Sequence, residues 1–292
     1  MAKSRGLAPL EVNRILTLDC RQASVVRQVR KVPELRAGFL TGFTLIELLV
    51  VIAIIVLLMA ILIPALQRTR AQAKDILCQS NLHQWGAIFA MYADSNKDHF
   101  FEPSTTWRNN HWIEPLRPYY KNPKILCCPE ATKPTEGIWG ETFKAWGHLN
   151  GDCGSYGANR WVYNARKDVG RFPADRHWKT LNIKGSADVP LFLDSRKCGF
   201  YALHVDPPPY IEDDRSNSVA TSSGRLGLLC INRHHRTING LFLDFSVKKV
   251  GLKQLWELDW HRDWYRNPET GIYDSNPPIW EVEAPWMKDL SR

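Results

Sequence analysis

The chain has 292 residues, of which 44% are hydrophobic and 11% are aromatic, so it can form a real core and is not disordered as a whole. Its 18 glycines and 18 prolines follow no period, which excludes collagen-like and low-complexity chains. The formal net charge of +8 would suit a nucleic-acid-binding protein. However, residues 1–42 alone hold eight lysines and arginines against three acidic residues. Because this basic excess precedes a long apolar run, it indicates membrane topology, and we expect no nucleic acid among the partners.

The apolar run covers residues 43–63 and contains a single charged residue, Glu47. As a helix rising about 1.5 Å per residue, it would be roughly 30 Å long, which matches the hydrocarbon core of a bilayer. A buried core helix rarely stays apolar on every face over this length. A cleaved secretory signal has a shorter apolar region that ends in small residues. We therefore expect a single-pass membrane helix, with the N-terminus cytoplasmic and the C-terminal part exported.

Glu47 is the exception within this apolar run. An ionised carboxylate in hydrocarbon costs on the order of 2.5–3.5 kcal/mol and by default indicates a functional site. No lysine, arginine or histidine lies elsewhere in the run to pair with it. Its partner must therefore come from another chain, or from an amine that processing of this chain creates.

The hexapeptide from Gly42 to Glu47, G-F-T-L-I-E, resembles the cleavage and methylation site of prepilins, the precursors of type IV pilins and type II secretion pseudopilins. The resemblance implies that a prepilin peptidase cuts after Gly42 and that Phe43 becomes the N-methylated N-terminus. It also implies that Glu47 pairs with the N-terminal amine of a neighbouring subunit. Pro64 then stands at mature position 22, where the family tends to carry a proline. The leader of residues 1–42 departs from the pattern, because family leaders are usually shorter and have a basic residue nearer the glycine.

Residues 65–94 continue the helix in an amphipathic pattern, with apolar positions at steps of three, four and seven. The segment D-S-N-K-D, which begins at Asp94, predicts the end of the helix. Residues 95–292 are aromatic and rich in loops. We expect short strands there at residues 124–126, 160–163, 190–193, 226–231, 240–245 and 246–250. Trp256, Trp260 and Trp264 are spaced as one stripe of a helix over residues 252–266, and such a stripe more often packs than binds a ligand.

These elements predict an α+β protein. The long N-terminal membrane-spanning helix would pack on a small, loop-rich globular domain with an antiparallel sheet, which is the pilin-like arrangement that the resemblance implies. The expected parts are a removed leader at 1–42, an assembly helix at 43–64, its amphipathic continuation at 65–94 and an exported domain at 95–292.

Further segments resemble a bacterial subfamily of pilin-like proteins that is named after a histidine followed, nine residues later, by Asp-Gly. Here His234 and Asp244 have that spacing, with Phe245 in place of the glycine. If that glycine supplies a positive φ, we expect this turn to differ. The other segments of the resemblance are 78–82, 92–94, 126–129, 154–159 and 190–194.

Of the seven cysteines, Cys20 lies in the leader and six lie in the part expected to be exported. An even number outside the cytoplasm fits disulfides, and six cysteines allow 15 pairings. We prefer a bridge from Cys78 to Cys128, or to Cys127, because it would tie the long helix to the domain. Buried free thiols are the alternative. A structural zinc site is not expected, because the sequence has no C-x-x-C pair.

The sequence offers little for catalysis. The best acid–base or metal-ligating residues are His204, Asp206, His234, His235 and Asp244, but the common nucleophile, phosphate-loop and metalloprotease motifs are missing. The aspartates at 194, 213, 214 and 244 lack the spacing of a calcium loop. We therefore expect no enzyme activity, no cofactor and no metal.

Two functional hypotheses follow. The first is a pilin-like filament subunit, whose implied partners are prepilin peptidase, other pilin-like subunits, the inner-membrane assembly platform with its ATPase, and membrane lipid. The second is a membrane-anchored exported binding protein or hydrolase with an aromatic-rich ligand-binding domain. A mere anchor needs neither Glu47 nor the junction of Gly42 and Phe43, and this favours the filament subunit.

Overall fold

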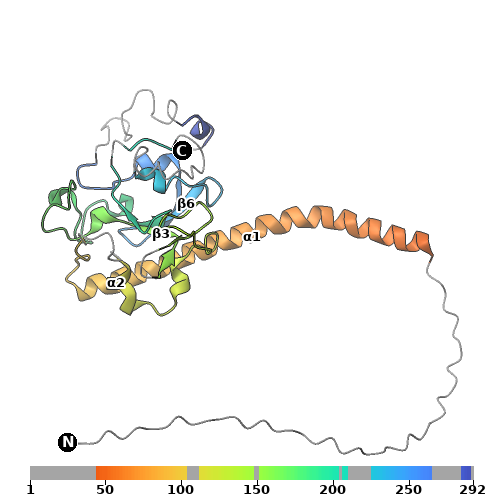
Figure 1. Ribbon diagram of the computed structural model, residues 1–292, viewed down its shortest axis with the longest axis horizontal. Helices are drawn as coiled ribbons and strands as arrows, with labels where there is room; N and C mark the ends of the chain where they lie inside the picture. The colour runs from red at the N-terminus through yellow and green to blue at the C-terminus, as the bar shows by residue number, and fades with distance from the viewer. Residues whose placement is uncertain are drawn as a thin grey trace, which may run out of the picture. The chain divides into compact units, whose positions relative to one another are not determined.

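The computed structural model describes residues 44–103, 112–147, 151–203, 206–209, 225–264 and 284–290. The chain divides into two units, one up to Val56 and one from Leu57 onward. The second unit holds the globular domain and the C-terminal part of the long helix α1, Leu45–Ser95 (Figure 1). The protein is therefore α+β, as predicted: one long apolar N-terminal helix and a small domain with a mixed sheet.

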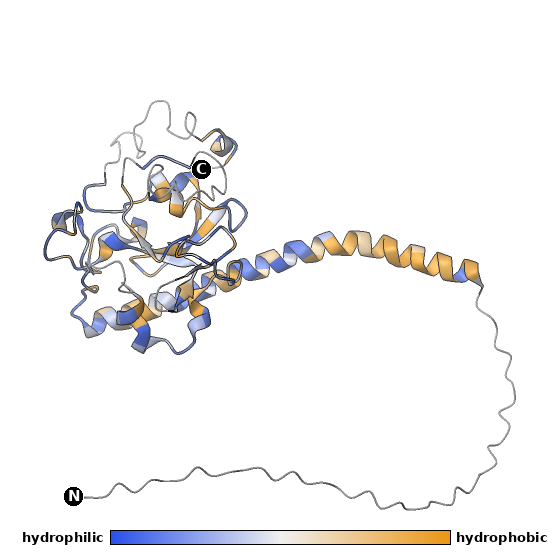
Figure 2. Ribbon diagram, viewed as in Figure 1, coloured by the Kyte–Doolittle hydropathy of each residue, from blue (hydrophilic) through white to orange (hydrophobic). Residues whose placement is uncertain are grey.

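Helix α1 changes character along its length. From Leu45 to Ile63 every side chain is exposed. All of these residues but Glu47 are apolar, as the mostly orange first part of the helix shows in Figure 2. This stretch is long and apolar enough to cross a membrane. After Pro64, which lies inside the helix, polar residues alternate with buried ones such as Leu82, Trp85 and Phe89. The helix ends at Ser95, where Lys97 and Asp98 take a positive φ and the Asp98 amide donates to the Ala93 carbonyl.

The main sheet has five strands in the order β5-β3-β4-β6-β7. The bounds of these strands are β3 Tyr156–Asn159, β4 Pro190–Asp194, β5 Gly199–Phe200, β6 Thr237–Phe242 and β7 Val247–Gly251. The pairs β3–β4, β4–β6 and β6–β7 are antiparallel, whereas β3 and β5 are parallel. The expectation of a purely antiparallel sheet is thus wrong at its β5 edge. A separate two-stranded sheet joins β1, Trp146–Gly147, to β2, Cys153–Gly154.

Two hydrophobic cores pack against the main sheet. Phe192 of β4 belongs to the core that holds Trp85 and Phe89 of α1, and its ring lies 5.3 Å from that of Trp85. Leu193, the next residue of β4, belongs to the second core, around Trp161. Neighbouring strand residues point to opposite faces, so β4 has α1 on one side and the second core on the other.

Three of the expected strands are wrong, because each segment forms a 3-10 helix whose first turn is bonded to a side-chain oxygen, local in two cases and distant in the third. Asn122 accepts from the Lys124 amide at the start of η2, Pro123–Leu126. At the start of η3, Arg160–Val162, the Asn159 side chain accepts from the Trp161 amide. At the start of η6, Leu226–Leu228, the Asp206 carboxylate accepts from the Leu226 amide. The other short helices are α2 Ile113–Leu116, η1 Arg117–Tyr119, η4 Ala174–Arg176, η5 Ser186–Asp188, η7 Lys253–Trp256 and η8 Pro285–Met287.

The tryptophan stripe does not lie on one helix. Helical structure ends at Trp256, and Trp260 and Trp264 follow in irregular backbone, although all three side chains are buried. The backbone of this segment is bound to other segments instead, since the Asp259 amide donates to the Asp188 carbonyl and the Arg262 amide to the Arg176 carbonyl. Tertiary hydrogen bonds have replaced the helical ones, and the stripe serves packing, as expected.

The turn between β6 and β7 contains Phe245, which has a φ of 64°. This is the left-handed region that favours glycine, and a larger residue pays roughly 1–2 kcal/mol to enter it. The backbone of this turn therefore takes the positive φ that a glycine would take, although the residue is Phe245. The expectation that the turn would differ from a glycine turn is wrong for the backbone. The Phe245 side chain packs against the core beside α1.

His177 gives the second core a pH dependence. Its ring is fully buried, 5.0 Å from that of Trp161, and Nδ1 lies 3.0 Å from the Pro173 carbonyl oxygen. Burial lowers the pKa of His177 to about 4; the Pro173 contact and Asp168 oppose this shift, whereas Lys179 and Arg160 add to it. In the folded state the imidazole of His177 therefore stays neutral down to about pH 4, whereas in the unfolded chain it is protonated below about pH 6.5.

We expect stability to fall as the pH drops from about 6.5 to about 4, because the unfolded state binds more protons in that window. Between pH 7 and pH 4.5, the free energy of unfolding of His177→Gln should fall by on the order of 2–3 kcal/mol less than that of the wild type. Urea unfolding of the full-length protein in detergent, followed by tryptophan fluorescence, measures the difference. Equal pH dependence in the variant and the wild type would contradict the assignment.

Candidate functional site

The start of α1 carries the charged group that the sequence singled out. The backbone amide and hydroxyl of Thr44 donate to Glu47 Oε2 at 2.9 and 2.7 Å, and the Glu47 amide donates to the Thr44 hydroxyl at 3.2 Å. This reciprocal pattern is a capping box, which stabilises the first turn of a helix. Glu47 thus has a local role that the sequence analysis missed, although the spacing of threonine and glutamate could have indicated it.

Glu47 is also fully exposed and lies in an apolar surface. Within the described part of the chain, the Glu47 carboxylate accepts its hydrogen bonds from Thr44. Gly42 and Phe43, the expected cleavage and methylation residues, lie outside the described residues. Pro64 lies within α1, at the end of the continuous apolar stretch. The expected pairing of Glu47 with a second subunit stays a prediction.

The second feature is a buried polar cluster where α1 crosses the sheet. Its centre is the Asp194 carboxylate at the end of β4, which has no exposed surface. Arg233 Nη1 donates to Asp194 Oδ1 at 2.9 Å. The other oxygen, Oδ2, accepts from the Asn239 amide at 2.9 Å and lies 3.1 Å from His234 Nε2.

Several hydrogen bonds fix the guanidinium group of Arg233 in place. Besides Asp194, its guanidinium donates to the carbonyl oxygens of Thr142 at 2.6 Å, Ser155 at 2.7 Å and Glu141 at 3.4 Å. Its side chain and that of Asp194 are both fully buried. Buried ion pairs persist only when further hydrogen bonds satisfy them, and these carbonyls supply those bonds.

Two cysteines complete the centre of the cluster. Cys78 Sγ of α1 lies 3.3 Å from the Tyr156 hydroxyl and 3.7 Å from Asp194 Oδ2. Cys128 Sγ lies 3.3 Å from His234 Nε2. Both cysteines are free and buried. The structure thus brings together the two residues of the preferred bridge, while the disulfide itself stays a prediction.

Asp75 connects the cluster to β6 and β7. Asn239 Nδ2 donates to Asp75 Oδ1 at 2.8 Å, and Lys249 Nζ forms an ion pair with Asp75 Oδ2. His234 Nδ1 lies 3.4 Å from Asp75 Oδ1. The imidazole of His234 is therefore placed between two carboxylates, those of Asp75 and Asp194.

The ionisation of these groups follows from the contacts. Burial lowers the pKa of His234, but Asp194 and Cys128 outweigh it and raise the pKa to about 10. Burial raises the pKa of Asp194, but Arg233 and His234 hold it below its usual value. Burial and the neighbouring Cys128 raise the pKa of the Cys78 thiol, whereas bonds from Cys78 and His234 overcome burial and lower the pKa of Cys128. The cluster is thus a set of buried, mutually compensating charges.

No protein-family model, curated protein or solved structure matches this chain. The site must therefore be interpreted from its own geometry.

His234 and Asp244, the two residues of the spaced motif, do not share a site. His234 precedes β6 and is buried in the cluster, whereas Asp244 follows β6 and is exposed in the turn. The six residues of β6 alone separate them by roughly 20 Å. Asp244 Oδ1 accepts from the amide and hydroxyl of Ser246, so it stabilises the turn.

Among the described residues, the remaining acid–base candidates, Asp206 and His235, do not meet in a site. Asp206 Oδ2 accepts from the amides of Leu203 and Leu226 and so joins two backbone segments. His235 is exposed, and His204, Asp213 and Asp214 lie outside the described residues. The sequence analysis missed Asp75, Arg233, Asn239 and Lys249, because no local motif indicates that they converge.

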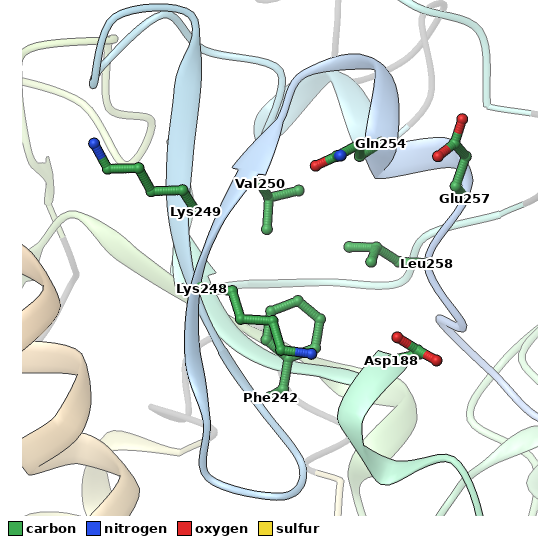
Figure 3. Close-up of a pocket in the computed structure, with 8 residues that line it drawn as sticks. All are labelled: Asp188, Phe242, Lys248, Lys249, Val250, Gln254, Glu257 and Leu258. Carbon is green, nitrogen blue, oxygen red and sulfur yellow. The ribbon is translucent and has the colours of Figure 1, made fainter. Parts of the chain in front are cut away.

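A separate open cavity of about 310 Å³ lies beside β7 (Figure 3). Its lining includes Phe242, Lys248, Gln254, Glu257 and Asp188. The Lys248 ammonium already donates to the Ala187 carbonyl at 2.7 Å, and Gln254 Oε1 accepts from the Gly251 amide at 2.8 Å. Two of the polar groups that line the cavity therefore serve the fold, and the buried cluster is the stronger candidate site.

Proposed function

We propose that the protein is a pilin-like structural subunit, a pseudopilin of a type II secretion system or of a type IV pilus-like filament. The observation that carries this proposal is the first part of α1, where a stretch of exposed apolar side chains is interrupted only by the carboxylate of Glu47. A simple anchor could keep the capping box with an uncharged glutamine at this position, so it does not need the costly charge. A polymerising helix does, because the charge can select one stagger between otherwise featureless apolar surfaces.

The second half of α1 supports the same proposal. Leu82, Trp85 and Phe89 are buried against the sheet, so this half belongs to the domain core while the first half stays available. In the proposed pathway, prepilin peptidase removes residues 1–42 and Phe43 is N-methylated. Before assembly, the processed subunit remains in the inner membrane with its globular domain in the periplasm. The assembly platform and its ATPase add it to a filament of pilin-like subunits, and it performs no catalysis.

Crosslinking of the tagged full-length protein in its own cells tests this proposal. We expect crosslinks to other pilin-like subunits of the same cell. The matched control replaces residues 43–63 with an uncharged polyleucine helix of equal length, which keeps the anchor and should lose the crosslinks. Equal crosslinking of both chains, or none to pilin-like subunits by either, would contradict the proposal and favour an anchored binding protein.

A further inference from the structure

Four metal-ligating side chains converge at the centre of the buried cluster. They are Cys78, Cys128, Asp194 and His234, all buried, and one donor atom of each lies within 4.8 Å of the others. Two sulfurs, one imidazole nitrogen and one carboxylate oxygen are all donors that bind Zn²⁺, and here the carboxylate takes the place of the fourth Cys or His of the usual structural site. We propose that these four residues bind a structural zinc ion. This site is independent of the proposed function as a filament subunit.

The distances between donor atoms fit a tetrahedral site. Zn–S bonds of about 2.3 Å and Zn–N or Zn–O bonds of about 2.0–2.1 Å separate tetrahedral ligand atoms by roughly 3.3–3.8 Å. His234 Nε2 lies 3.1 Å from Asp194 Oδ2 and 3.3 Å from Cys128 Sγ, and Cys78 Sγ lies 3.7 Å from Asp194 Oδ2. Small side-chain movements therefore suffice to place all four atoms around one ion.

The groups around these residues are those that orient metal ligands. His234 turns its other nitrogen, Nδ1, to the Asp75 carboxylate at 3.4 Å, which is the carboxylate–histidine–metal arrangement of many zinc sites. Arg233 and the Asn239 amide hold the two oxygens of Asp194. The Tyr156 hydroxyl lies 3.3 Å from Cys78 Sγ. Three of the four ligands thus have a fixed outer partner.

The charges also balance. Two thiolates, one carboxylate and a neutral imidazole around Zn²⁺ leave a single negative charge, and the fully buried Arg233 lies beside it. Asp75 is paired separately with Lys249. A closed site with no net buried charge avoids the large cost of burying an uncompensated ion.

The ligands come from distant parts of the domain. Cys78 lies on α1, Cys128 follows η2, Asp194 ends β4 and His234 precedes β6. One ion would therefore fasten the long helix to the sheet in the second unit. A disulfide between Cys78 and Cys128 would join only two of these segments and would not use the imidazole and the carboxylate. The sequence offered no C-x-x-C pair, because this site takes one ligand from each segment.

Metal content of the full-length protein tests the site. The protein is purified in detergent through a tag without histidine and without chelators, and its metals are measured by mass spectrometry. We expect close to one zinc ion per chain. Cys128→Ser should retain less than a tenth of that zinc, while Cys153→Ser, a partly buried cysteine outside the cluster, should retain all of it. Asp75→Asn should weaken zinc affinity by about 10–100-fold, because it removes the partner of His234.

Reconstitution of the wild-type protein with Co²⁺ gives a readout that does not depend on a variant folding. A tetrahedral thiolate site should produce visible absorption and a sulfur-to-cobalt charge-transfer band. Wild-type protein that neither holds zinc nor gives the cobalt bands would overturn the proposal. A Cys78–Cys128 disulfide in a non-reducing peptide map, or full zinc content in Cys128→Ser, would overturn it as well.

Discussion

Glu47→Gln is expected to reduce incorporation into a filament by about tenfold or more, while the chain still inserts into the membrane. In the proposed filament, the Glu47 carboxylate pairs with the N-terminal ammonium of Phe43 in an adjacent subunit. A hydrogen bond to a charged group contributes roughly 1.5–3 kcal/mol, and about 1.4 kcal/mol corresponds to a factor of ten. The apolar flanks supply most of the attraction, and the ion pair fixes the stagger. Pull-down of crosslinked, tagged subunits measures the incorporated fraction.

The capping box makes this substitution informative. Glutamine is accepted at the third helical position of a capping box, so Glu47→Gln removes the charge and keeps the cap. Thr44→Ala does the reverse: it removes the hydroxyl that bonds Glu47, at a cost of about 1 kcal/mol to the helix start, and keeps the carboxylate. We expect Thr44→Ala to assemble nearly as well as the wild type. If both variants assemble normally, Glu47 is only a cap, and if only Thr44→Ala fails, capping and not charge governs assembly.

Arg233→Met is expected to destabilise the globular domain by about 3–5 kcal/mol. Removing one partner of a buried ion pair is strongly destabilising, because Asp194 would keep only His234 as a compensating charge and has no exposed surface on which water could solvate it. The substitution also removes the donor to the carbonyls of Thr142 and Ser155. Urea unfolding of the full-length protein, monitored by tryptophan fluorescence, measures the loss.

The matched control is Arg117→Met. Arg117 pairs with Glu114 at 2.9 Å and Asp152 at 2.7 Å, but its side chain is 45% exposed. Exposed ion pairs contribute only about 0–1 kcal/mol, so the control should unfold nearly as the wild type does. A loss below about 1 kcal/mol for Arg233→Met would show that the buried pair is not required for the fold.

The features that the sequence predicted best depend on local pattern. The apolar run from residue 43 to 63 and the break at Asp94 predicted a long helix, which ends at Ser95. The apolar segments at 190–193 and 246–250 predicted strands that are present as β4 and β7. In each case, the side chains that determine the element lie within the element itself.

The features that sequence reasoning missed depend on hydrogen bonds that the hydrophobic pattern does not indicate, some of them local and others between distant residues. The side chain of Asn122 or Asn159 turns a strand-like segment into a short helix, and a hydrogen bond from Asp259 to Asp188 replaces a helical bond after Trp256. The buried cluster shows the same limit. Cysteine count and helix position suggested that Cys78 lies near Cys128, but nothing local places Asp194 and Arg233 beside them.

The central claim, that this chain is a processed pilin-like subunit, is tested most directly by the mass of its mature N-terminus. The tagged protein is extracted from membranes of cells with an active prepilin peptidase, digested and analysed by mass spectrometry. The account predicts that residues 1–42 are absent and that the chain begins with N-methylated Phe43. Recovery of the intact leader, or cleavage at a different junction, would contradict it.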